Sequence, residues 1–145
     1  MMKQPKHVMA IDPGGAHVGV ASWHGGDEIK ATEIAAELWL PIFAAGIMHV
    51  DVAVIEKFVL YPSKAKSQAW SPMATSEMIG AMKWIAQRAH VPVVEQGADI
   101  KNPTRRQCKA RHIQWKDNKS GHASDAILHL QHFLIRNELQ DEEAL

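Results

Sequence analysis

The sequence contains a single cysteine, Cys108, so no disulfide can form within the chain, and we expect a reducing compartment. Nothing at the N-terminus resembles a signal peptide. Long apolar runs are also missing, because the longest, LWLPIFAAGIMHV, falls short of the roughly 20 residues that a bilayer requires and contains Pro41. We therefore expect a cytoplasmic protein with no membrane partner.

An excess of charge of either sign is missing as well, because 16 basic residues balance 16 acidic ones. The charges are nevertheless unevenly placed. Seven basic residues lie between Lys101 and Lys119 beside one acid, Asp117, whereas residues 138–145 carry four acids. A basic segment offset by an acidic tail fits nucleic acid binding on one face, although a solvated loop would show the same charges.

The hydrophobic content of the chain is ordinary for a soluble domain. Of its 145 residues, 46% are hydrophobic and 22% are charged, and we see no repeat or low-complexity segment. The sequence predicts one domain over residues 1–138, followed by an acidic tail over residues 139–145.

Short apolar runs and helical stripes alternate along this domain. Strands are predicted over 7–11, 18–23, 28–32, 51–56 and 91–95, and helices from an N-cap at Thr32 (kinked or broken at Pro41), from Ser71–Pro72 to Ala89, around 105–111, and over 118–139. Met78, Met82 and Ile85 form one core stripe, and Ile127, Leu130 and Leu134 form another. The order predicts an α/β fold with a mixed five-stranded sheet, three antiparallel strands and then two parallel to the first, flanked by helices.

Two acids stand where predicted neighbouring strands end. Asp12 follows the strand HVMAI, and Glu56 ends DVAVIE. If these strands are parallel neighbours, both carboxylates emerge at one edge of the sheet, where open α/β sheets bind ligands. Two such carboxylates repel, so one must bind a proton or the pair must hold a cation. Alternatively, Asp12 only forms a turn and Glu56 pairs with Lys57 or an arginine.

The last predicted helix supplies further candidates. His122 and Asp125 are three residues apart in its first turn, on one face, and Gly121 would let that turn approach the sheet. Together with Asp12 and Glu56 they form an oxygen and nitrogen donor set suited to Mg²⁺ or Mn²⁺. Alternatively, His122 is simply a residue at the N-terminus of this helix. His129 and His132 are predicted to lie too far along the helix to join the site, as surface or partly buried residues.

Three segments, AIDPGGAHVGVASW, VAVIEKF and HASDAILHL, resemble the RuvC-like Holliday junction resolvases, a branch of the ribonuclease H-like fold. The resemblance implies that Asp12, Glu56 and Asp125 are metal-binding acids, with His122 at a position where the family often has Asp. It also implies that Lys101 stabilises charge at the scissile phosphate. The short chain is similar to phage-encoded members, which act in the bacterial cytosol of the host.

The same resemblance implies a DNA-binding surface and a homodimer. Phe58, Tyr61 and Trp70 would stack on bases, and Lys64, Lys66, Lys101, Arg105, Arg106 and Lys109 would contact phosphates. Alternatively, Phe58 packs in the hydrophobic core and does not stack on a base. The helix over residues 72–89, with Gly80 and Ala81 permitting close approach, would form the dimer contact, or else pack on the sheet.

These observations predict metal-dependent hydrolysis of phosphodiesters in branched DNA, at four-way junctions, flaps or forks. One cation would be bound by Asp12 and Asp125 and a second by Asp12 and Glu56, about 4 Å apart. Three alternatives remain open from the sequence: a YqgF-like nuclease acting on structured RNA, an actin-like nucleotide-binding domain, and a catalytically silent module that binds branched DNA.

Overall fold

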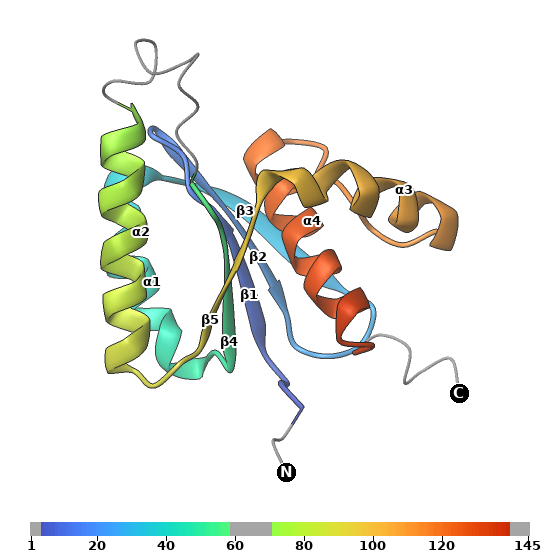
Figure 1. The fold of residues 1–145 in the computed structure, drawn as a ribbon, viewed down its shortest axis with the longest axis horizontal. Coiled ribbons are helices and arrows are strands. Elements are labelled where there is room, and N and C mark those ends of the chain that lie inside the picture. The colour runs from blue at the N-terminus through green and yellow to red at the C-terminus, as the bar shows by residue number, and fades with distance from the viewer. Residues whose placement is uncertain (1–3, 59–70, 140–145) are drawn as a thin grey trace.

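The computed structural model describes residues 4–58 and 71–139, and the strands in them form one mixed sheet in the order β3-β2-β1-β4-β5 (Figure 1). The antiparallel part consists of β1 (Val8–Asp12), β2 (His17–Trp23) and β3 (Ile29–Ala35). The parallel part adds β4 (Val52–Glu56) beside β1 and then β5 (Val93–Gln96) at the edge. The predicted fold class and strand directions are confirmed.

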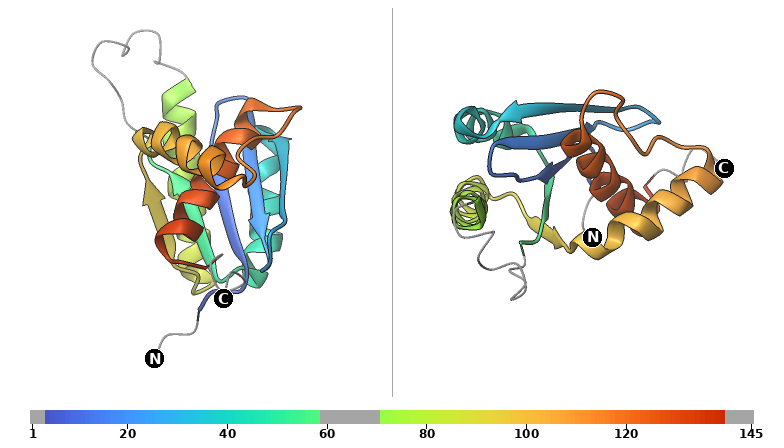
Figure 2. Two further views of the ribbon diagram at one scale, coloured as in Figure 1. Left: turned by 90° about the vertical axis from the view of Figure 1, so that its right-hand side faces the viewer. Right: turned by 90° about the horizontal axis from the view of Figure 1, so that it is seen from above.

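Helices cover both faces of this sheet (Figure 2). On one face lie α1 (Ala36–Gly46), the short 3₁₀ helix η1 (Ile47–His49) and α2 (Ser71–Arg88). On the other face, α4 (Gly121–Arg136) crosses β1 to β4, and α3 (Lys101–Arg111), preceded by the 3₁₀ helix η3 (Ala98–Ile100), packs against α4. Within the described segments, no helix is long and apolar enough to cross a bilayer.

The central strands are apolar on both sides because each side contributes to a separate core. Met9 and Ile11 of β1 pack with α1 and α2, whereas Val8 and Ala10 pack with α4. β4 divides in the same way, with Val54 on the α4 side. Side chains alternate along a strand, so the next residues of this parity, at the carboxyl ends of β1 and β4, also belong to the α4 face.

The boundary between β3 and α1 differs from the sequence-based prediction. The third strand does not end at Thr32 but continues to Ala35, and the helix begins at Ala36 without a side-chain cap. The reason is the β2–β3 hairpin, whose pairing runs from Trp23 opposite Ile29 to His17 opposite Ala35. These cross-strand bonds override the local helix preference of TEIAAE. The helix is not broken at Pro41 and runs on to Gly46.

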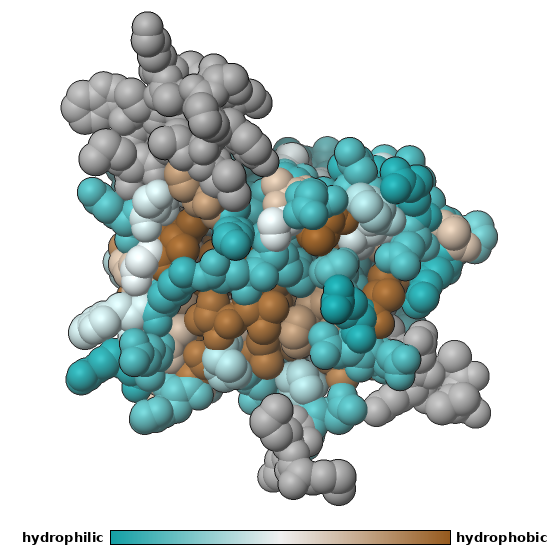
Figure 3. All heavy atoms as spheres, viewed as in Figure 1, coloured by the Kyte–Doolittle hydropathy of each residue, from teal (hydrophilic) through white to brown (hydrophobic). Residues whose placement is uncertain are grey.

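The core stripes of the other two long helices are confirmed. In α2, Met82 is fully buried, and Met78 and Ile85 pack against the same core. In α4, the residues Ile127, Leu130 and Leu134 are fully buried. Figure 3 shows hydrophobic side chains at the surface between α2 and α4, where the edge strand lies.

Candidate active site

Asp12 and Glu56 lie at the carboxyl ends of the adjacent parallel strands β1 and β4, on the face covered by α4. The register of the two strands pairs Ile11 with Ile55, so the two acids follow at the same level of the sheet. Glu56 is in turn paired with Gln96 of β5. Both acids are largely shielded from solvent, with side-chain exposures of 10% for Asp12 and 13% for Glu56. The predicted convergence of these two carboxylates is confirmed.

The first turn of α4 sits directly on the hairpin beside these acids. Ser120 caps the helix by accepting a hydrogen bond from the Ala123 amide, and its hydroxyl donates to Glu33 of β3. The close approach depends on Gly19 of β2, because a Cβ there would lie 1.9 Å from the His122 carbonyl oxygen. A Cβ at Gly121, the glycine that the sequence suggested for this role, would have no atom within 4 Å. The sequence therefore predicted correctly that this turn approaches the sheet, but it assigned the approach to Gly121, whereas the structure assigns it to Gly19.

Three side chains on one stripe of α4 reach the acids. The His122 Nδ1 lies 3.1 Å from Asp12 Oδ2, and Asp125 follows one turn later with its side chain one-third exposed. The third is His129, which is fully buried, with Nε2 3.4 Å from Glu56 Oε2 and Nδ1 2.8 Å from the Gln96 amide oxygen.

The prediction that His129 lies too far along the helix was therefore wrong. Four residues advance a helix by only about 6 Å, and helical side chains tilt toward the N-terminus, so the His129 ring reaches back to Glu56. Gln96 was not predicted either. The sequence nevertheless held a signal for Gln96. It stands two residues after Val94 at the end of a strand, so both side chains lie on one buried face, where a polar residue needs a partner.

Lys101, the first residue of α3, places a cation among these carboxylates. Its Nζ lies 3.2 Å from Glu56 Oε1 and 3.3 Å from Asp125 Oδ2. The attraction of these two carboxylates outweighs the effect of burial and raises the pKa of Lys101 above its ordinary value. Lys101, for which the resemblance implies a role at the scissile phosphate, thus lies among the acids, and its ammonium joins strand β4 to helix α4.

Burial and the neighbouring groups shift the pKa values of Asp12 and Glu56 in opposite directions. Burial, a hydrogen bond with Glu56, and the charges of Glu56 and Asp125 raise the pKa of Asp12 to about 9. Burial also opposes ionisation of Glu56, but the close contact with His129, a hydrogen bond with Asp12 and the charge of Lys101 outweigh it and hold the pKa of Glu56 below its ordinary value. Without a metal cation, the pair therefore keeps one proton, on Asp12, near neutral pH.

The donor chemistry of this cluster fits hard divalent cations. Asp12, Glu56 and Asp125 offer carboxylate oxygens, and His122 offers an imidazole nitrogen. Among the described residues, however, no three such side chains already surround one point as a metal site. Lys101 lies between Glu56 and Asp125, so a cation binding there would have to displace it, and Asp12, whose pKa is raised, would have to lose its proton. A bound metal cation would take the place of both the Lys101 ammonium and the Asp12 proton.

A basic stripe leads from the site along α3. Lys101, Arg105 and Lys109 are spaced by four residues, so they follow one side of the helix over about 12 Å. Arg105 and Lys109 lie over the ring of Trp115, with Lys109 Nζ 4.6 Å from its centroid, and Lys116 is a third cation at 5.2 Å. Trp115 was not singled out from the sequence, since one aromatic residue in a polar loop carries no pattern.

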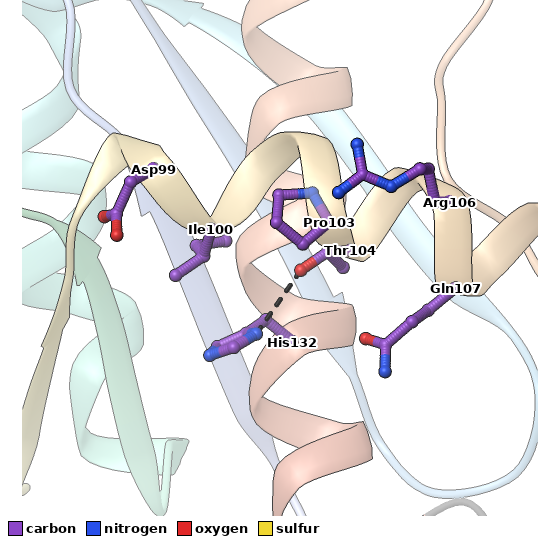
Figure 4. A pocket seen from close by; sticks show the side chains of 7 residues that line it. All are labelled: Asp99, Ile100, Pro103, Thr104, Arg106, Gln107 and His132. Carbon is purple, nitrogen blue, oxygen red and sulfur yellow. Dashed lines mark hydrogen bonds between the residues drawn. The ribbon is translucent and has the colours of Figure 1, made fainter.

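The other side of α3 anchors it to α4. The Thr104 hydroxyl lies 3.3 Å from Nδ1 of His132, which is partly buried as predicted (Figure 4). Arg106 lines the same pocket as Asp99 and Gln107, but Figure 4 shows its side chain on the other edge of α3 from the Thr104–His132 contact. Arg106 thus diverges from the stripe formed by Lys101, Arg105 and Lys109.

Several predicted DNA-binding residues lie outside the described part of the chain: Tyr61, Lys64, Lys66 and Trp70. Phe58 is described. It is partly buried and packs against the core formed with α1 and α2, as its alternative role in the core requires.

The fold defined by this sheet and its helices is ribonuclease H-like, of the RuvC type. Two solved structures share it: "T. thermophilus RuvC in complex with Holliday junction substrate", at 17% identity over 91% of this chain and 95% of that one with a TM-score of 0.63; and "Thermus thermophilus RuvC structure", at 19% identity over 92% and 97% with a TM-score of 0.62. No protein-family model and no curated protein matches the sequence. At these identities, the similarity establishes the fold alone.

Proposed function

We propose that this chain is a metal-dependent endonuclease that hydrolyses phosphodiesters in branched DNA. The observation that carries the proposal is the meeting of Asp12, Glu56 and Asp125 with Lys101 and His122 at the carboxyl ends of β1 and β4, in a RuvC-like fold. One of the two similar structures holds RuvC with a Holliday junction substrate. That similarity is our reason for proposing branched DNA as the substrate.

The proposed site would hold Mg²⁺ or Mn²⁺ through Asp12, Glu56, Asp125 and His122. When bound, two such cations activate water and stabilise the leaving oxygen in phosphodiester hydrolysis. Asp12 must first lose the proton that its raised pKa retains. Lys101, released from Glu56 and Asp125, is then free to neutralise the phosphate, and His122, nearly half exposed, can orient a water at the open side.

The stripe of Lys101, Arg105 and Lys109 is the proposed path of one DNA arm. It starts in the site and ends at Trp115, where three cations surround one indole ring. Like charges gathered in this way repel one another, and a phosphate backbone relieves the repulsion. The contacts would position DNA without reading its sequence.

The proposed enzyme acts as a homodimer through the face opposite the acids. Among the described residues, Leu38 and Ile42 of α1 and Trp84 of α2 are large hydrophobic side chains that are 47–62% exposed. The two helices are in contact, and a Cβ at Gly80, one turn before Trp84, would meet nothing. A second copy covering these helices would bury this apolar surface.

The deciding experiment is cleavage of end-labelled four-way, three-way, flap and linear DNA, and of structured RNA, with Mg²⁺ or Mn²⁺. We expect cleavage of branched DNA by the wild type and none by Asp12→Asn. Asp27→Asn, in the exposed turn between β2 and β3, is the matched control and should cleave like the wild type. Preferential cleavage of RNA would favour the YqgF-like alternative, and binding of branched DNA without metal binding or cleavage would favour the silent module.

A further inference from the structure

His129 and Gln96 are polar side chains buried in a part of the protein that is otherwise apolar. His129 is fully buried and Gln96 is 8% exposed, while their neighbours Ala126, Leu130 and Val94 belong to the core beneath α4. Burying an imidazole and an amide costs free energy unless their polar atoms find partners. Here Nδ1 of His129 meets the Gln96 amide at 2.8 Å, whereas Nε2 has no hydrogen-bond partner among the described residues and lies 3.4 Å from Oε2 of Glu56.

Glu56 is consequently held from both sides. Oε1 faces Lys101 of α3 at 3.2 Å, and Oε2 faces His129 of α4 at 3.4 Å. A metal cation that displaced Lys101 would leave the contact with His129 in place, because the His129 ring is packed inside the protein. A carboxylate with one oxygen fixed in this way presents the other oxygen in a defined direction.

The chemistry of the contact determines where the imidazole proton must be. A Glu56 carboxylate offers only lone pairs, so an Nε2 that holds it must carry a proton. In the neutral ring, Nδ1 then accepts, and the Gln96 amide meets it with its NH₂ group after a half-turn, which exchanges two atoms of nearly equal size. The Gln96 amide can therefore satisfy Nδ1 in the ring form that holds Glu56.

We propose that His129 is a positioning residue that, with Gln96, orients the Glu56 carboxylate for cation binding. This inference rests on the proposed function, because it takes Glu56 to be a metal ligand. Hydrogen-bond partners of ligating carboxylates support metal affinity, and their loss costs about 10–100-fold.

The first test is calorimetric titration of the DNA-free protein with Mn²⁺. We expect His129→Met and Gln96→Met each to weaken Mn²⁺ binding about 10–100-fold, and the double variant to lose little more, because both act through one carboxylate. His129→Gln, which keeps a donor, should recover most of the affinity. His132→Met, one turn further along α4 and paired with Thr104, is the matched control and should bind like the wild type.

The second readout needs no metal, and its first observation is made on the wild type. In ¹⁵N spectra of the wild type in EDTA, Nε2 of His129 should be protonated, and Glu56→Gln should shift its resonance. A bare Nε2, or Mn²⁺ binding by His129→Met equal to that of the wild type, overturns the positioning role and leaves the proposed nuclease intact. If the wild type neither binds Mn²⁺ nor cleaves DNA, the proposed function fails, and the spectra still decide whether His129 holds Glu56.

Discussion

The Lys101 ammonium lies 3.2 Å from Glu56 and thereby occupies a position that the proposed metal cation would need. Lys101→Met removes this charge from two partly buried carboxylates. We expect the variant without metal to unfold at a temperature about 3 °C lower, corresponding to about 1 kcal/mol for a partly buried ion pair. Because the metal then has no competitor, adding Mn²⁺ should raise its unfolding temperature more than that of the wild type.

Lys109→Met, at the far end of the same helix, is the control for Lys101→Met in calorimetric unfolding with EDTA and with Mn²⁺. It should respond to Mn²⁺ as the wild type does. An equal Mn²⁺ effect in Lys101→Met and the wild type would show that the ammonium does not compete with the cation.

Asp12 makes the stability of the metal-free protein depend on pH. Its pKa rises to about 9 in the folded state, so the folded chain binds a proton that the unfolded chain releases near pH 4. The stability from this group is complete below about pH 4 and declines as the pH rises toward 9. In EDTA, Asp12→Asn should therefore be more stable than the wild type at pH 8, by at least about 1 kcal/mol, with a difference that shrinks toward pH 4.

Urea unfolding of the wild type and Asp12→Asn in EDTA between pH 4 and 9 measures this dependence. Because Asp12 must lose this proton to bind a metal, we also expect Mn²⁺ binding to the wild type to release a proton and to become tighter as the pH rises. Parallel stability curves for the two proteins would mean that Asp12 is ionised in the folded state.

Gly19 sets the distance between α4 and the sheet. Since a Cβ at this position would lie 1.9 Å from the His122 carbonyl, Gly19→Ala must push the first turn of α4 away from β2. We expect a loss of about 1–3 kcal/mol in unfolding free energy and a larger fractional loss of Mn²⁺ affinity, because His122 and Asp125 move with the turn.

Gly121→Ala provides the comparison for Gly19→Ala, since a Cβ there has open space. It should retain both stability and Mn²⁺ binding in the same unfolding and calorimetric experiments. Loss of binding in Gly121→Ala but not in Gly19→Ala would restore the sequence-based interpretation of this turn.

The basic stripe on α3 predicts the salt dependence of DNA binding. In EDTA, where cleavage is blocked, Lys109→Ala and Arg105→Ala should each weaken binding of a four-way junction. Each should also reduce the slope of log affinity against log salt by about 1. Fluorescence anisotropy over a range of salt measures the slope, and Lys30→Ala on the edge strand β3 should leave it unchanged.

The exposed apolar face of α1 and α2 predicts the oligomeric state. Trp84→Glu combined with Ile42→Glu should convert a dimer into a monomer in sedimentation velocity, because charge cannot be buried in a self-complementary contact. Trp115→Glu, on the opposite side of the sheet, should remain dimeric. A wild-type protein that sediments as a monomer at all concentrations would rule out this interface.

The sequence predicted those features that depend on local patterns. The order of strands and helices placed Asp12 and Glu56 at one edge of the sheet, and helical spacing placed His122 beside Asp125. It failed where distant contacts decide. The extent of β3 follows from pairing with β2, the role of Gly19 follows from a helix that arrives about 100 residues later, and the reach of His129 depends on the angle at which α4 crosses the sheet. No periodicity in one segment contains these relationships.

The exposed apolar helices and the acidic cluster occupy opposite faces of the same sheet, so the two surfaces can be altered independently. On the proposed function, each subunit cuts one strand, and paired incisions require two subunits. Splitting the pair through Trp84 and Ile42 should leave every acidic side chain in place and yield a nickase that breaks a single strand of a branched substrate.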